Sequence, residues 1–174
     1  GALRERVALL KGLPVAVIDR VIRDRITLMP GGPALVATMK AHGAYAALVS
    51  GGFTAFTSAI AATLGFDENR ANLLNSEGGF LTGSVAEPIL GRQAKVDALV
   101  DICARLGIAE TEVMAVGDGA NDLGMLGRAG AGSVQMAGGA TLKPVLDDPV
   151  FHALQGRPGG GCGSRACPVR PSRR

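Results

Sequence analysis

Strand-like and helix-like segments alternate along most of this chain, and that alternation constrains the fold more than any other feature. Helical patterns cover residues 33–41, 53–64, 93–106 and 121–129, and apolar strand patterns cover residues 45–49, 113–116 and 132–136. Short links join these segments, which favours a parallel sheet covered by helices. We therefore predict an α/β fold with a doubly wound, mostly parallel sheet. Two weaker strands around Glu77-Gly78-Gly79 predict a hairpin within residues 71–85.

The two ends of the chain follow other patterns. Residues 2–10 and 15–26 have the spacing of amphipathic helices, and Pro30-Gly31-Gly32 separates them from the alternating region. Residues 158–174 are rich in Gly, Pro and Arg without periodicity, which is typical of disorder. We divide the chain into a helical segment at 1–28, an α/β core at 29–150 and a disordered basic tail at 151–174.

Charge and hydropathy argue against two classes of partner. The formal net charge of +3 comes from the tail, where several arginines follow residue 156 without any acid. No aromatic residue is interleaved there to stack on bases, so we interpret the tail as a solvated segment and predict no nucleic-acid binding. No apolar run approaches the ~20 residues of a membrane span, so we predict no membrane association.

The cysteines indicate a compartment rather than a site. Cys103 lies in an apolar helical pattern, and Cys162 and Cys167 have no second pair and no nearby His, which argues against zinc. An odd, sparse set of cysteines favours a reducing environment, so we predict a cytoplasmic protein.

A possible anion site follows the strand pattern at residues 45–49. Ser50-Gly51-Gly52 lies between that strand and a helix, where backbone N–H groups and the helix dipole favour an anion. The glycines permit close approach, and the Ser50 hydroxyl adds a donor. The alternative is that Ser50 only caps the following helix.

Three further groups have chemistry that suits a phosphate and its metal. Asp118 and Asp122 follow the strand pattern at 113–116, and carboxylates at a strand end suit Mg²⁺, although either could simply cap a helix. Lys95 lies at the start of a helix, where the dipole disfavours a cation, so it either reaches toward an anion or is solvated. Arg6, on the first helix, can grip a carboxylate with two parallel hydrogen bonds or remain in solvent.

Taken together, these segments resemble the phosphoserine phosphatases of the haloacid-dehalogenase superfamily. The resemblance covers about residues 2–145 and is carried by Val49-Ser50-Gly51-Gly52-Phe53-Thr54, Lys95 and Val116-Gly117-Asp118-Gly119-Ala120-Asn121-Asp122-Leu123, with residues 2–14 similar to the helical cap of that family. It implies a haloacid-dehalogenase-like, Rossmann-like core, with residues 1–28 as the C-terminal part of the cap.

The resemblance also implies roles for individual residues. Ser50 and the Gly51 amide resemble the phosphate-binding pair, and Lys95 resembles the lysine that neutralises the phosphate and the nucleophile. Asp122 resembles the acid that orients this lysine. The remaining matches are Asp118 as the Mg²⁺ ligand, Asn121 as a substrate contact and Arg6 as the cap arginine that binds the substrate carboxylate.

One motif of that family does not occur in the chain. The family's nucleophile lies in an Asp-x-Asp-x-Thr motif upstream of the cap, and no such motif is present here, so we expect the chain to begin inside the cap. The missing motif follows the first core strand, which lies between the strands that carry Ser50 and Asp118. Without that strand we expect two unpaired strand edges and a compromised fold.

These inferences converge on one predicted activity with two alternatives. We predict Mg²⁺-dependent hydrolysis of O-phosphoserine to L-serine and phosphate, the last step of serine biosynthesis, through an aspartyl-phosphate whose nucleophile this chain does not supply. The chain as written is therefore expected to be inactive. The alternatives are a non-catalytic phosphate-binding, metal-binding or interaction module, and a related phosphatase for another small phosphate ester. The sequence does not indicate an oligomeric state.

Overall fold

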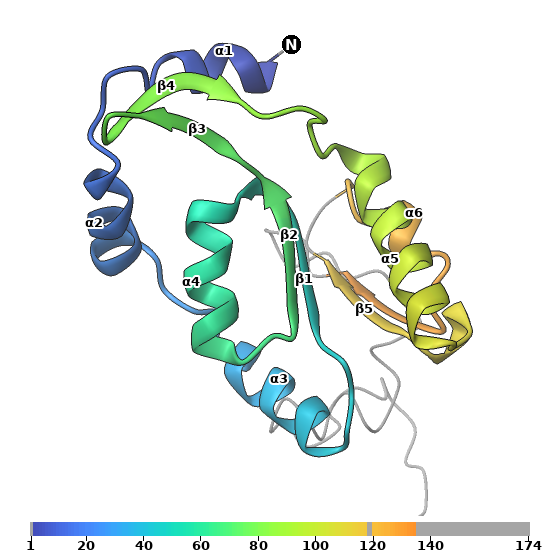
Figure 1. The fold of residues 1–174 in the computed structure, drawn as a ribbon. Coiled ribbons are helices and arrows are strands. Elements are labelled where there is room, and N and C mark those ends of the chain that lie inside the picture. The colour runs from blue at the N-terminus through green and yellow to red at the C-terminus, as the bar shows by residue number, and fades with distance from the viewer. Residues whose placement is uncertain (1, 118–119, 135–174) are drawn as a thin grey trace, which may run out of the picture.

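The computed structural model describes residues 2–117 and 120–134 of the 174-residue chain (Figure 1). Its elements are α1 Ala2–Ala8, α2 Ala16–Arg25, α3 Gly32–Ala41, β1 Ala47–Phe53, α4 Thr54–Leu64, β2 Glu68–Asn72, β3 Leu74–Glu77, β4 Phe80–Val85, α5 Arg92–Leu106, the 3₁₀ helix η1 Glu110–Glu112, β5 Met114–Gly117, α6 Leu123–Leu126 and β6 Ala131–Val134. The predicted disordered tail lies outside the described residues.

Parallel strand pairs joined by helices confirm the predicted α/β class. β1 pairs in parallel with β2, and β5 pairs in parallel with β6 from Met114↔Ala131 to Gly117↔Val134. Helix α4 connects the strands of the first pair and α6 lies between the strands of the second, because parallel neighbours need a crossover connection, which is usually a helix. The third pair, β3 with β4, is antiparallel and confirms the predicted hairpin.

The parallel strands do not form one continuous sheet within the described part of the chain. β1 is hydrogen-bonded only to β2, and β5 only to β6, so each of these four strands keeps one unpaired edge among the described residues. Helix α5 contacts β1 of the first pair and also α6, the helix that lies between the strands of the second pair. Val116 of β5 is 52% exposed.

The hairpin packs with the N-terminal helices. Val7 of α1 and Ile18 of α2 form a buried apolar cluster with Leu74 of β3 and Leu81 of β4. Helix α1 lies close to β4 at Gly83, where φ is +79° and an added Cβ would be 2.9 Å from the Cβ of Lys11. Glycine is therefore required there for both its backbone angle and its size. The hairpin and the two helices form one small packing unit.

Two elements differ from the sequence expectation. Strand β2 was not predicted, because its sequence, Glu-Asn-Arg-Ala-Asn, has low strand propensity and no apolar alternation. Pairing with β1 stabilises it instead. Helix α6 spans Leu123–Leu126, much shorter than the predicted 121–129, and it ends at Gly127. No helix in the part of the chain that the structure describes is long and apolar enough to cross a bilayer.

Candidate functional site

The Ser50-Gly51-Gly52 turn lies within β1, where the pairing with β2 becomes irregular. The register shifts between Val49 and Phe53, and this break frees the intervening residues from ladder pairing. The Gly52 amide donates a hydrogen bond to Ser50 Oγ across 3.0 Å, and Ser50 is half-buried while Gly51 is exposed. The predicted strand end at Val49 is thus a bulge inside a longer strand, and it leaves the Gly51 backbone accessible.

Lys95 and Asp122 form an ion pair between the first turn of α5 and the N-cap position of α6. The Lys95 ammonium donates a hydrogen bond to Asp122 Oδ1, and the side chains are only 18% and 3% exposed. Burial weakens solvent screening of such a pair. The carboxylate also offsets the unfavourable position of a cation at the amino-terminal end of α5. Lys95 is therefore held inward and is not a solvated surface lysine.

Glycine at position 117 makes room for the Asp122 side chain. An ideal Cβ added to Gly117, the last residue of β5, would lie 2.6 Å from Asp122 Oδ2 and closer still to two carbons of that side chain. Because no other residue lacks a Cβ, only glycine permits this packing. The carboxylate is thereby pressed against the end of β5.

The other predicted site residues that the structure describes, Arg6 and Asn121, are exposed. Arg6 is exposed on α1 and makes no hydrogen bond or ion pair with any described residue, whereas its neighbour Arg4 pairs with Glu87. Asn121 is exposed between β5 and α6. Asp118, the predicted Mg²⁺ ligand, lies outside the described residues, so that prediction is not tested.

One buried carboxylate, that of Asp122, lies among the described residues. Within residues 2–117 and 120–134 no group of three or more His, Cys, Asp or Glu side chains gathers. Asp122, the buried carboxylate beside the end of β5, is engaged by Lys95 and is suited to orienting an ammonium.

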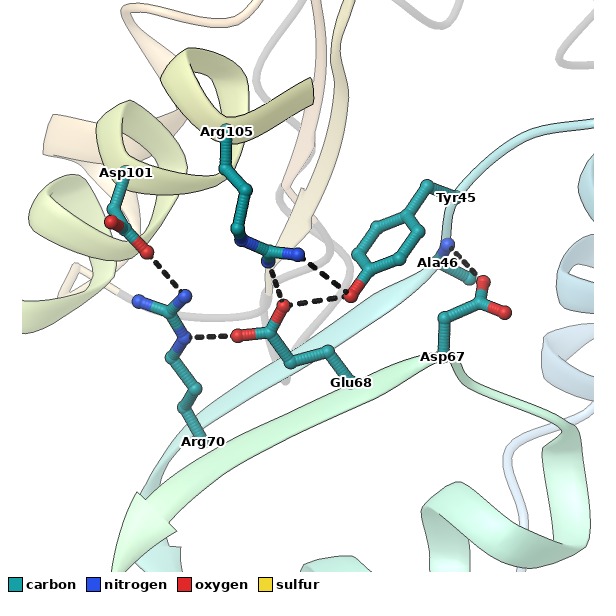
Figure 2. A network of polar contacts seen from close by, with 7 residues as sticks. All are labelled: Tyr45, Ala46, Asp67, Glu68, Arg70, Asp101 and Arg105. Atoms are coloured by element: carbon teal, nitrogen blue, oxygen red, sulfur yellow. Dashed lines mark hydrogen bonds and ion pairs between the residues drawn. The ribbon is translucent and has the colours of Figure 1, made fainter.

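A polar network holds the carboxyl-terminal half of α5 against β2 (Figure 2). Glu68 accepts hydrogen bonds from Arg70, from Arg105 and, at 2.8 Å, from the Tyr45 hydroxyl, and Arg70 also pairs with Asp101 of α5. Partial burial opposes ionisation of Glu68, but the hydrogen bonds from Arg70 and Tyr45 outweigh it and hold the pKa of that carboxyl below its usual range. Helix α5 is thus fixed at both ends, by this network and by the Lys95–Asp122 pair.

One buried polar residue near the site was missed by the sequence reasoning. Asn72 ends β2 and is 2% exposed, and its side chain is hydrogen-bonded to the backbone of Gly51 and Leu90. Asn72 fell inside residues 71–85, which were predicted to hold two weak strands, but the polar sequence of β2 gave no signal that this side chain would be buried.

Comparison with known proteins identifies the family. The model of the haloacid dehalogenase-like hydrolases matches residues 1–127, and the chain belongs to this family. Its relatives narrow the class further. It is 46% identical over 133 residues to a phosphoserine phosphatase of Polaromonas sp. strain JS666, covering 74% of this chain and 56% of that protein.

Two more proteins similar to this chain are also phosphoserine phosphatases. A phosphoserine phosphatase of Lactococcus lactis is 44% identical over 156 residues, which cover 90% of this chain and 69% of that protein. A phosphoserine phosphatase solved with bound substrate superposes with a TM-score of 0.71 at 39% identity, covering 76% of this chain and 62% of the solved one. The haloacid-dehalogenase-like fold and the resemblance to phosphoserine phosphatases are confirmed. The chain spans about half the length of the first curated relatives that it matches.

Proposed function

We propose that this chain carries the phosphate-binding part of a Mg²⁺-dependent hydrolase that converts O-phosphoserine to L-serine and phosphate, as the last step of serine biosynthesis. The observation that carries the proposal is the buried pair of Lys95 and Asp122, a lysine fixed inward beside the end of a parallel strand. Such a lysine is a point charge that a phosphate can use. The similarity to phosphoserine phosphatases supplies the substrate.

Each residue has a distinct task in this proposal. The Ser50 hydroxyl and the Gly51 amide donate hydrogen bonds to phosphate oxygens, and the exposed Gly51 backbone permits that approach. Lys95 neutralises phosphate charge, and Asp122 keeps its ammonium in place. Asn121 contacts the substrate. These groups bind and orient the phosphoryl group, which is most of what phosphoryl transfer requires from a protein.

Arg6 gives the proposed substrate its second anchor. Its guanidinium is exposed and makes no ion pair within the described chain, so it is able to grip the carboxylate of phosphoserine with two hydrogen bonds. A phosphate ester without a carboxylate would not use this arginine. Arg6 therefore separates phosphoserine from other small phosphate esters, which are the alternative substrates.

Mg²⁺ and the nucleophile complete the proposed reaction. Mg²⁺, held by Asp118, would neutralise phosphoryl charge. In the family resemblance an aspartate of an Asp-x-Asp-x-Thr motif attacks phosphorus, giving an aspartyl-phosphate that water then hydrolyses, and the 174 residues contain no such motif. We propose that these residues alone bind phosphate without turning over phosphoserine. The free, buried Cys103 is consistent with our proposal of a cytoplasmic location.

Two measurements on the purified 174-residue chain test the proposal. Isothermal titration with inorganic phosphate, with and without Mg²⁺, is expected to show Mg²⁺-enhanced binding, which Lys95→Met abolishes. Release of phosphate from O-phosphoserine is expected to stay at background. Robust turnover would overturn the account of the nucleophile, and no phosphate binding under any condition would overturn the phosphate site. An interaction module without ligand would give neither signal.

A further inference from the structure

Two polar or charged residues are buried in the part of the chain that the structure describes, and they are Asp122 and Asn72, each 2% exposed. Asp122 belongs to the ion pair with Lys95. The proposed function assigns no role to Asn72. Burying a carboxamide is unfavourable unless its donors and acceptor are satisfied, so its partners show what it fixes.

The Asn72 carboxamide bridges the bulge in β1 and the loop that precedes α5. Its Nδ2 donates to the Gly51 carbonyl at 2.9 Å and to the Leu90 carbonyl at 3.3 Å, while its Oδ1 accepts from the Leu90 amide at 2.6 Å. The opposite amide orientation would place an oxygen against two carbonyl oxygens, so the bonding pattern determines the orientation. Leu90 is thus held through both its N–H and its C=O, as a neighbouring strand would hold it.

The bond to Gly51 reaches Ser50 through one peptide group. In a trans peptide the C=O and the N–H point in opposite directions, so fixing the Gly51 carbonyl also fixes the Gly52 N–H. That N–H donates to Ser50 Oγ at 3.0 Å. Because Ser50 Oγ accepts this bond, its own proton is directed elsewhere and is available to an anion. Linked hydrogen bonds of this kind polarise one another in the same direction.

The hydrogen bonds to Leu90 connect Asn72 to the start of the helix that carries Lys95. Leu90 immediately precedes Gly91, the N-cap residue of α5, and Lys95 lies in the first turn of that helix. The same carboxamide therefore fixes the phosphate-binding turn of β1 and the start of the helix that carries the candidate cation. No other described side chain is hydrogen-bonded to both the β1 bulge and the loop before α5.

We propose that Asn72 is a positioning residue: it orients the Ser50 hydroxyl as a donor and sets the Ser50 turn and the amino-terminal end of α5 in register to receive a phosphate. The expected effect on phosphate binding rests on the proposed function. The hydrogen bonds that link Asn72 to the Ser50 hydroxyl are present in the ligand-free protein. Its two parts are therefore tested by different measurements.

The first measurement follows amide hydrogen exchange by NMR in the ligand-free 174-residue chain. Asn72→Ala is expected to accelerate exchange at Gly52 and Leu90 by about tenfold or more, while Ser50→Ala accelerates Gly52 alone. If Asn72→Ala folds poorly, Asn72→Thr replaces it, because threonine favours strands but is too short to bond both Gly51 and Leu90. It should accelerate exchange at the same two amides. Asn75→Ala, which removes a comparable amide bond to Ser84 on the hairpin, should change neither amide. Unchanged exchange at Gly52, or a uniform acceleration over β1, β2 and α5, would overturn the proposal.

The second measurement is a double-mutant cycle on inorganic phosphate affinity in Mg²⁺. If Asn72 acts through Ser50, then Asn72→Ala and Ser50→Ala each weaken binding by about tenfold and the double variant is little weaker than the worse single variant. Losses that multiply would contradict a shared route. If the unmutated chain binds no phosphate, the proposed function fails, and the exchange measurement still decides whether Asn72 orients the turn.

Discussion

The Lys95 ammonium is hydrogen-bonded to the Asp122 carboxylate although the two residues are 27 positions apart, and the pair joins the first turn of α5 to the start of α6. The carboxylate is the more deeply buried partner, with 3% of its side chain exposed against 18% for the lysine. This asymmetry has consequences for stability, because an unpaired charge is most unfavourable where water is excluded.

Removing the lysine should therefore destabilise the fold more than neutralising the acid. We expect Lys95→Met to lower the free energy of unfolding by about 3 to 5 kcal/mol, because it removes the ammonium that is hydrogen-bonded to the buried Asp122 carboxylate. Asp122→Asn keeps an acceptor and should lower it by about 1 to 2 kcal/mol. Chemical denaturation measures both. Adding Asp122→Asn to Lys95→Met should recover part of the loss, and equal effects of the two single variants would contradict this account.

Gly117→Ala should displace the Asp122 side chain, since the added methyl group would lie 2.6 Å from Oδ2. We expect a loss of about 1 to 3 kcal/mol in the free energy of unfolding, from overpacking against a buried carboxylate. Gly32→Ala is the matched control, because a Cβ there meets nothing within 4 Å and its φ is not positive. Similar melting temperatures for the two variants would show that Asp122 moves aside without strain.

The Glu68 network predicts a pH-dependent stability. Partial burial raises the pKa of Glu68, but its hydrogen bonds from Arg70 and Tyr45 bring it below the ordinary value of 4.5. A lowered folded-state pKa means that the ionised group stabilises the fold above about pH 4.5, and that this contribution is lost as the pH falls through the folded-state pKa. Glu68→Gln should thus cost about 1 to 2 kcal/mol at neutral pH and progressively less in acid.

Urea denaturation at a series of pH values measures this difference. Glu77→Gln is the control, since Glu77 is exposed on β3 and makes no ion pair with a described residue. A difference between Glu68→Gln and the unmutated chain that stays constant into acid would show that Glu68 acts through packing and not through its charge.

Arg6 and Arg4 lie on the same short helix but should differ in ligand binding. Arg4 is engaged by Glu87, whereas Arg6 has no ion-pair partner among the described residues. We expect Arg6→Ala to weaken phosphoserine binding by about 10- to 100-fold without changing the affinity for inorganic phosphate, because only phosphoserine presents a carboxylate. Arg4→Ala should affect neither ligand. Titration calorimetry with both ligands measures the effects, and an equal loss for phosphate would remove Arg6 from substrate selection.

Much of the fold was predictable from local pattern. The apolar runs before Ser50 and Asp118, and the helical spacing at residues 93–106, predicted β1, β5 and α5 with small errors in their bounds. Strand β2 was not predictable in this way, because its polar residues form a strand only through pairing with β1. That error also hid Asn72, whose importance lies in what it contacts and not in its sequence surroundings.

The amino-acid sequence by itself determined the α/β class, the hairpin and the order of the residues that resemble a phosphatase site, since these depend on periodicity, glycine placement and local motifs. The pairing of Lys95 with Asp122 was expected from the family resemblance. Tertiary structure alone decided how deeply that pair is buried, that Gly117 makes room for the carboxylate and that Asn72 links the β1 bulge to the loop before α5. Burial and hydrogen bonding are properties of segments brought together from distant parts of the chain. A local pattern contains no information on which distant group will satisfy a given charge or amide.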